Sequence, residues 1–134
     1  LMRILVVEDT ESIAHMISAL VKARGHEVVS VGTGAKAIEV ALKDSFDLVL
    51  LDINLPGTMD GFGVCKKLRT EVGMVATPVI FISAMSDDEY KTRAYEHGAS
   101  AFYTKPFSPL ALLKEIEAIS VRTSGKFKAS DPQA

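Results

Sequence analysis

Short apolar runs recur along the chain and alternate with segments of helical periodicity. The runs cover residues 4–7, 28–31, 48–51, 79–82 and 101–103, and most of them are continuous rather than alternating. Continuous runs of this length are typical of strands that are buried on both faces, as in a parallel sheet. We therefore expect five parallel strands, each followed by a helix.

Two apolar stripes with helical spacing support the intervening helices. One stripe consists of Ile13, Met16, Ile17, Leu20 and Val21, and the other of Leu112, Leu113, Ile116 and Ile119. The alternation predicts the α/β class: a (βα)5 doubly wound parallel five-stranded sheet with right-handed crossovers. In a sheet of this kind a ligand binds beyond the carboxyl ends of the strands.

Residues with capping preferences mark several helix starts. Asp60 is a predicted N-cap, and Ser108 places a capping hydroxyl before a proline in the first helical turn. Ser86 together with Glu89 predicts a capping box that opens a further helix.

Length and composition indicate one globular domain. The chain has 134 residues, of which 48% are apolar and 24% are charged, as is usual for a domain with a proper core. Residues 122–134 are polar and lack periodicity. We therefore expect the domain to cover residues 3–121, and residues 122–134 to be a disordered tail or the start of a linker.

Charge and cysteine content argue against several classes of function. The net charge of −2 gives no electrostatic basis for direct nucleic-acid binding. No apolar run approaches the roughly 18 residues that span a bilayer, so we expect no membrane partner. Cys65 is the only cysteine and cannot form an internal disulfide, which favours the cytoplasm.

The residues at the predicted carboxyl ends of the strands carry the candidate chemistry. They are Glu8 and Asp9 after the first strand, Asp52 after the third, Ser83 after the fourth, and Thr104 with Lys105 after the fifth. Each one alone would be an ordinary strand-end residue, but the combination is not ordinary. Crowded carboxylates repel one another unless a cation is present, and Mg²⁺ prefers oxygen ligands and often bridges carboxylates to phosphate. The set favours a magnesium site suited to phosphoryl transfer.

The motifs around these residues resemble the receiver domains of two-component response regulators, over residues 3–121. The matching segments are ILVVED at 4–9, DLVLLDINLPGTMDG at 47–61, VIFISA at 79–84, GAS at 98–100 and FYTKPF at 102–107. The resemblance implies a CheY-like protein with the flavodoxin-like strand order 2-1-3-4-5. It also implies a phosphoacceptor with slow self-catalysed chemistry rather than a turnover enzyme.

The resemblance assigns the acidic residues to a nucleophile and a Mg²⁺ site. Asp52 would be the nucleophile that takes a phosphoryl group from a histidine kinase or a histidine phosphotransfer protein. Asp9 would ligate Mg²⁺ directly, and Glu8 directly or through water. Asp52 and the backbone carbonyl of Asn54 would supply further ligands.

The resemblance also assigns the residues that respond to phosphorylation. Lys105 would pair with the incoming phosphate oxygens, Ser83 would hydrogen-bond the phosphoryl group, and Phe102 occupies the aromatic switch position. The bond between Lys105 and Pro106 is expected to be cis. The face formed by the fourth helix, fifth strand and fifth helix would control a downstream protein or an output domain, or support a homodimer.

Three features depart from the commonest pattern of the family. Residues 57–60 include one residue more than the usual loop after the phosphoacceptor. Ser83 replaces the more frequent threonine and keeps the hydroxyl group. Phe102 replaces the frequent tyrosine, and Tyr103 should point to the opposite face of the strand.

Other functions share parts of this pattern. A degenerate receiver that acts as a phosphate-independent interaction module would look the same in sequence. A small aspartyl phosphatase of the haloacid dehalogenase type would need a general acid two residues beyond the nucleophile, where this chain has Asn54. An FMN protein would need a phosphate cradle without carboxylates after the first strand. Gly32 and Gly34 fit a dinucleotide fingerprint loosely, but they follow the second strand.

Overall fold

The computed structural model describes residues 1–129, with side chains described through Arg122. Five parallel strands form one sheet in the order β2-β1-β3-β4-β5. The strands are β1 (Arg3–Val7), β2 (Glu27–Val31), β3 (Leu48–Asp52), β4 (Val79–Ser83) and β5 (Ala101–Thr104). The predicted α/β fold and its strand order 2-1-3-4-5 are confirmed.

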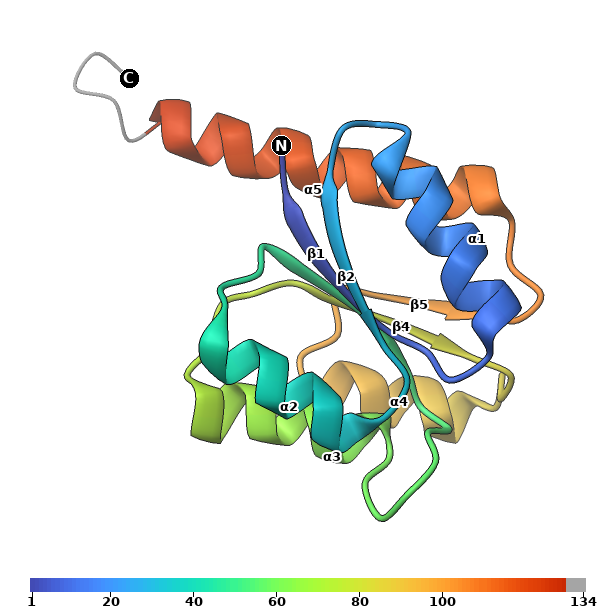
Figure 1. Cartoon of the computed structure of the whole chain (residues 1–134). Helices are drawn as coiled ribbons and strands as arrows, with labels where there is room; N and C mark the ends of the chain where they lie inside the picture. The colour runs from blue at the N-terminus through green and yellow to red at the C-terminus, as the bar shows by residue number, and fades with distance from the viewer. Residues whose placement is uncertain (130–134) are drawn as a thin grey trace.

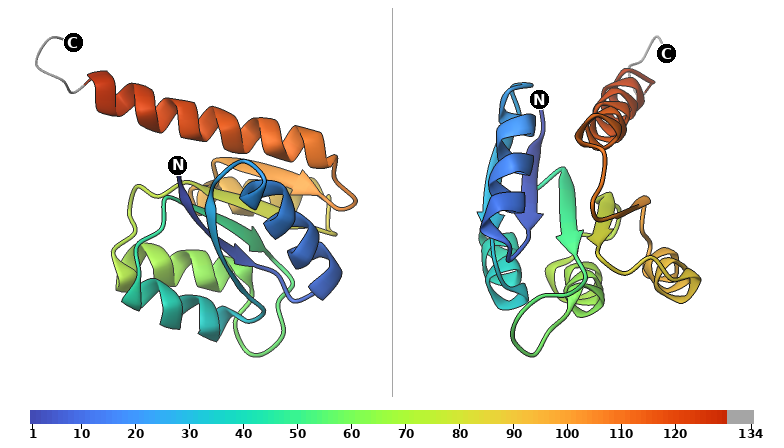
Figure 2. Two further views of the ribbon diagram at one scale, coloured as in Figure 1. Left: turned by 45° about the horizontal axis from the view of Figure 1, so that its top comes forward. Right: turned by 90° about the vertical axis from the view of Figure 1, so that its right-hand side faces the viewer.

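Helices cover both faces of the sheet. They are α1 (Glu11–Lys22), α2 (Gly34–Lys43), α3 (Gly61–Lys67), α4 (Asp88–Glu96) and α5 (Pro109–Ala129), and α3 continues into a π-helical turn, η1 (Leu68–Val72). Figure 1 shows α1 and α5 on one face, and α2, α3 and α4 on the other. The result is a three-layer α/β/α arrangement, which the end-on view of Figure 2 also shows.

The sheet separates two apolar cores. Along β1, Ile4 and Val6 face the side of α1 and α5, while Leu5 and Val7 face the side of α2, α3 and α4. Every residue of β3 and β4 is buried. This two-sided burial explains why the central strands have continuous apolar runs instead of an alternating pattern.

Two predicted helix caps are present. The Asp60 carboxylate accepts a hydrogen bond from the Gly63 backbone N–H at 2.9 Å. The Ser108 hydroxyl oxygen accepts one from the Ala111 N–H at 3.1 Å. Each bond satisfies a first-turn donor that has no partner inside its own helix.

The predicted capping box of Ser86 with Glu89 is wrong. Helix α4 begins at Asp88, its N-cap is Asp87, and the N-cap side chain makes no capping hydrogen bond. Two acidic side chains in the first turn, Asp88 and Glu89, instead face the positive end of the helix dipole.

Helix α5 crosses the predicted domain boundary at residue 121. Its backbone helix continues to Ala129, and its C-terminal part extends beyond the sheet (Figure 2). Residues 130–134 of the predicted tail lie outside the described residues. The division into a domain at 3–121 and a tail or linker at 122–134 therefore stays a prediction. None of the helices within residues 1–129 has the length and apolarity needed to cross a membrane.

Candidate functional site

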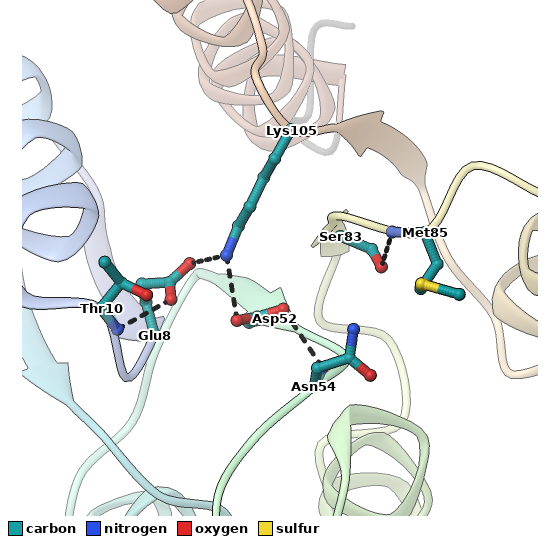
Figure 3. A network of polar contacts seen from close by, with 7 residues as sticks. All are labelled: Glu8, Thr10, Asp52, Asn54, Ser83, Met85 and Lys105. Carbon is teal, nitrogen blue, oxygen red and sulfur yellow. Dashed lines mark hydrogen bonds and ion pairs between the residues drawn. The ribbon is translucent and has the colours of Figure 1, made fainter.

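The predicted site residues gather at the carboxyl edge of the sheet. Glu8 and Asp9 follow β1, Asp52 is the last residue of β3, and Lys105 follows β5. Parallel strands bring these positions together because all their carboxyl ends lie at the same edge. Figure 3 shows the Glu8 and Asp52 carboxylates on either side of the Lys105 ammonium group, which points between them.

One lysine bridges two carboxylates. The Lys105 Nζ lies 2.6 Å from Glu8 Oε1 and 3.0 Å from Asp52 Oδ2 (Figure 3). Glu8 and Asp52 are each only 4% exposed. The two carboxylates are thus almost completely withdrawn from water, and a buried carboxylate without a charged partner would be costly.

Backbone amides hold the second oxygen of each buried carboxylate. The Thr10 N–H donates to Glu8 Oε2 at 3.0 Å, and the Asn54 N–H donates to Asp52 Oδ1 at 3.2 Å. Both donors lie two residues beyond the acid, in the loop that follows the strand. These local bonds fix the direction in which each carboxylate points before any ligand arrives.

The electrostatics of the site oppose ionisation of Asp52. The pKa of Asp52 is raised from 3.8 to about 6. Burial is the largest cause and the charge of Glu8 adds to it, while the hydrogen bond and charge of Lys105 act in the opposite direction. Burial lowers the pKa of Lys105, but its hydrogen bonds to Glu8 and Asp52 outweigh this, and the net shift is upward. At neutral pH we therefore expect a charged lysine and a mostly ionised but destabilised Asp52.

The acidic residues fit a divalent cation. Glu8, Asp9 and Asp52 each offer a carboxylate oxygen, and these oxygens lie within 4.8 Å of one another. Asp9 is exposed, and its carboxylate makes no hydrogen bond or ion pair within the described part of the chain. Three carboxylates face a single ammonium group, so the cluster keeps an excess of negative charge. A hard cation with oxygen ligands is suited to this excess.

Ser83 lies beside the cluster without joining it. It is buried at the end of β4, the strand next to Asp52, and its hydroxyl oxygen accepts a hydrogen bond from the Met85 N–H at 3.0 Å (Figure 3). The hydroxyl proton is therefore available to donate to a new acceptor. The structure brings Ser83 near Asp52, but no hydrogen bond joins these two residues.

Phe102 and Tyr103 point to opposite sides of β5, as the sequence predicts. Phe102 is half-buried against the core on the side of α3 and α4, and Tyr103 packs on the side of α1 and α5. The Tyr103 hydroxyl donates to the Ala111 carbonyl at 3.2 Å. The peptide bond between Lys105 and Pro106 is cis, as predicted.

Gly61, which the sequence analysis did not single out, lies against the backbone of Asp52 and Ile53. Its N–H donates to the Ile53 carbonyl at 2.7 Å. A methyl group added at Gly61 would lie 2.7 Å from the Ile53 Cα and closer still to the Asp52 carbonyl oxygen. Only glycine permits this approach. A glycine directly after an N-cap residue, at a helix start, was the signal available in the sequence.

The fold and this site define a class of protein. A parallel sheet of order 2-1-3-4-5 carries an acidic pair, a buried aspartate and a lysine at one edge, as in phosphoacceptor signalling domains. The sequence model of the response regulator receiver domain matches residues 4–117. The chain belongs to the response regulator receiver domain family of two-component signalling.

Individual relatives agree with this assignment. The chain is 36% identical over 118 residues to the response regulator PleD of Caulobacter vibrioides, covering 88% of this chain and 26% of PleD. It is 36% identical over 124 residues to the cell cycle response regulator CtrA of Brucella ovis, covering 92% of this chain and 52% of CtrA. The chain thus spans a quarter to a half of these relatives.

A solved structure supports the same assignment. The chemotaxis protein CheY4 of Vibrio cholerae superimposes with a TM-score of 0.81 at 32% sequence identity. The match covers 87% of this chain and 97% of CheY4. The fold of CheY4 therefore matches most of this chain.

Proposed function

We propose that this receiver domain accepts a phosphoryl group on Asp52 in a Mg²⁺-dependent reaction and then switches its α4-β5-α5 face. The donor is a phosphohistidine on a histidine kinase or a histidine phosphotransfer protein. The observation that carries the proposal is the buried Asp52, held between the Asn54 N–H and Lys105 beside two further carboxylates. Each chain accepts one phosphoryl group on its single Asp52, so the domain is a substrate of the kinase or phosphotransfer protein that phosphorylates it.

The reaction begins with Asp52 in its ionised form. A carboxylate oxygen attacks the phosphorus in line, an O–P bond forms, and the P–N bond to the imidazole of the donor breaks. The electron pair of that bond stays on the imidazole nitrogen. Burial favours the attack, because it destabilises the ionised carboxylate, and forming the O–P bond relieves this by spreading the negative charge onto the phosphoryl group.

Lys105 supplies the positive charge on the side of the attack. Its Nζ already touches Asp52, so a small side-chain rotation brings it to the oxygens of the incoming phosphoryl group. A preorganised ammonium group stabilises the charge that spreads over these oxygens in the transition state.

Glu8, Asp9, Asp52 and the backbone carbonyl of Asn54 would hold Mg²⁺. The bound ion would neutralise the carboxylates and the charge on the phosphoryl oxygens. Supporting this role, oxygens of the three carboxylates lie within 4.8 Å of one another, and Lys105 pairs with only two of these acids, Glu8 and Asp52.

The switch uses Ser83 and Phe102. A phosphoryl group adds about −1.5 to −2 of charge, and the Ser83 hydroxyl donates to it. This draws the loop after β4 toward Asp52, and Phe102 moves into the space that the loop leaves. The α4-β5-α5 face then changes its affinity for a downstream protein or an output domain, or for a second copy of the chain.

The partners follow from the relatives and stay part of the proposal. PleD and CtrA are named as response regulators, and both are longer than this chain. A cytoplasmic location rests only on the single cysteine, which is buried and free.

Intact mass after incubation with acetyl phosphate tests the central step. We expect a gain of one phosphate that requires both Mg²⁺ and Asp52, and no gain in Asp52→Asn. A gain in Asp52→Asn would overturn the assignment. If the wild-type protein gains nothing from acetyl phosphate and nothing from a phosphorylated kinase, the domain is a phosphate-independent interaction module and the proposal is wrong.

A further inference from the structure

Helix α4 is attached to the domain differently from the other helices. Of its nine residues only Ala94 is buried. Helix α1, in contrast, buries Ala14, Ile17 and Val21. Apolar burial alone therefore holds α4 weakly, and the contacts that fix its position must be sought elsewhere.

Those contacts converge on one ring, that of Phe62 in α3. The Arg93 guanidinium carbon lies 4.1 Å from the centre of the Phe62 ring. The Tyr90 ring stacks on it at 6.2 Å with an interplanar angle of 28°, and the His97 ring lies at 5.2 Å. Positions 90, 93 and 97 are three and four residues apart and face the same way, so two side chains of α4 and that of its C-cap residue contact a single ring.

The two ends of α4 are held unequally. At the C-terminal end, the Cys65 thiol donates to the His97 carbonyl at 3.3 Å, and the Arg69 guanidinium donates to the Gly98 carbonyl at 3.3 Å. Burial raises the pKa of Cys65, which keeps the thiol protonated and able to donate. At the N-terminal end the N-cap makes no side-chain bond, and residues 84–89 are exposed.

Phe62 is also tied to the phosphoacceptor. It follows Gly61, whose N–H bonds to the Ile53 carbonyl and whose Cα packs against the backbone of Asp52. On its other side the Phe62 ring contacts the Phe81 ring at 5.6 Å. Phe81 is the register partner of the switch residue Phe102. A displacement at Asp52 or at Phe102 therefore reaches Phe62 within a few packed groups.

We propose that the Phe62 ring is the contact that fixes the position of α4. When the contacts of Arg93 and Tyr90 with this ring change, α4 pivots about its C-terminal end. The first half of the proposal, called the resting half, is that the Phe62 ring positions α4 in the unphosphorylated domain, and it needs only the contacts described above. The second half, called the coupled half, is that phosphorylation moves α4, and it depends on the proposed function.

Residue-resolved amide exchange by NMR, corrected for intrinsic rates, tests the resting half. Arg93→Ala removes the cation–ring contact, which predicts exchange about two- to five-fold faster at residues 91–93 and unchanged exchange at residues 97–99. Lys91→Ala is the matched control, because it removes an exposed cation from the same helix without touching Phe62. Phe62→Leu should raise exchange at residues 91–93 further, by roughly ten-fold, because it also removes the stacking contact.

Two results would overturn the resting half. One is an Arg93→Ala effect no larger than that of Lys91→Ala, and the other is an equal effect at both ends of α4. If Phe62→Leu loosens the whole fold, Arg93→Ala still decides, because Arg93 is exposed and outside the core.

Beryllofluoride with Mg²⁺ tests the coupled half. We expect exchange to change at residues 91–93 but not at 97–99, and the change to shrink in Arg93→Ala. An equal change in Arg93→Ala would exclude Phe62 as the coupling contact. Phosphate incorporation by mass is recorded in parallel. No incorporation would refute the proposed function while leaving the resting result valid.

Discussion

The two edges of the sheet hold similar charged residues in different surroundings. At the amino edge, Arg3 pairs with Asp44 at 3.1 Å and with Glu27 at 3.9 Å, and these side chains are 38%, 45% and 75% exposed. At the carboxyl edge, Lys105 pairs with Glu8 and Asp52, whose side chains are 2% and 4% exposed.

The difference lies in the balance of charge as well as in burial. At the amino edge the ions share their charge with water, and each exposed pair contributes little to stability. At the carboxyl edge one ammonium group faces three carboxylates, of which two are withdrawn from water. Ion pairs alone therefore do not make a reactive site. Burial and an unbalanced charge distinguish the carboxyl edge, and they are the properties on which the proposed binding of a cation and a phosphoryl group depends.

Removal of Lys105 should have the largest effect on the proposed reaction at the carboxyl edge. We expect Lys105→Met to lower the rate of phosphate incorporation about 10²- to 10³-fold, because the ammonium group stabilises the phosphoryl oxygens only in the transition state. The rate is measured by intact mass over time with acetyl phosphate and Mg²⁺. Lys66→Met, at an exposed position of α3, is the control. A rate within three-fold of wild type, roughly 0.7 kcal/mol, would contradict this role.

Crowding the backbone behind Asp52 should affect stability more than any single ion pair. Gly61→Ala forces a methyl group against the Asp52 carbonyl and should lower the free energy of unfolding by about 3 kcal/mol. Urea unfolding measures the change. Gly32→Ala is a matched control, because the nearest atom would lie 3.9 Å from its new methyl group. Equal losses in the two variants would show that the close approach is not what matters.

The pH dependence of stability should reveal the cost of ionising Asp52. The folded protein holds this proton up to about pH 6, whereas the unfolded chain loses it near 3.8. Between these values the folded state binds more protons, so stability falls as pH rises and levels off above about 6.5. At pH 7.5 without Mg²⁺, Asp52→Asn should therefore be more stable than wild type by about 2 kcal/mol.

Urea unfolding of wild type and Asp52→Asn in EDTA, from pH 4.5 to 7.5, measures whether the variant becomes the more stable protein as the pH rises. The difference should be small at pH 4.5, and Mg²⁺ at pH 7.5 should stabilise wild type far more than the variant. A variant that is less stable than wild type at pH 7.5 in EDTA would contradict the raised pKa of Asp52.

Removal of an ion pair at the amino edge should have the smallest effect on stability. Asp44→Ala removes an exposed partner of Arg3 and should lower the free energy of unfolding by about 0.5 kcal/mol. The loss should become smaller in 0.5 M salt, because exposed charges are screened. Urea unfolding at low and high salt measures it. A loss above about 2 kcal/mol would mean that the two edges are more alike than their exposure indicates.

The sequence predicted the strands, and the meeting of the candidate site residues at one edge of the sheet, because both depend on short-range patterns. Each predicted strand lies within one residue of the observed one at either end. The positions of Glu8, Asp52 and Lys105 followed from counting strand ends, since parallel strands put those ends at one edge. Motif resemblance added the cis bond before Pro106.

Other features could not be predicted because they depend on contacts between elements. The start of α4 was placed at a capping box that the folded chain does not use. The Phe62 ring carries no signal in sequence that it will receive Arg93, which lies 31 positions later (93 − 62). The raised pKa of Asp52 likewise needs the burial and the neighbouring charge that the assembled sheet provides.

Hydrophobic period and strand-end chemistry are local properties, so the chain itself carries the fold class and the identity of the reactive groups. Distances, burial and the direction of each pKa shift arise only when distant segments pack together. Glu8, Asp52 and Lys105 are far apart in sequence and become one charged cluster only at the edge of the sheet. The seating of α4 on Phe62 is decided in the same way, because a helix with one buried residue takes its position from the neighbours that it meets.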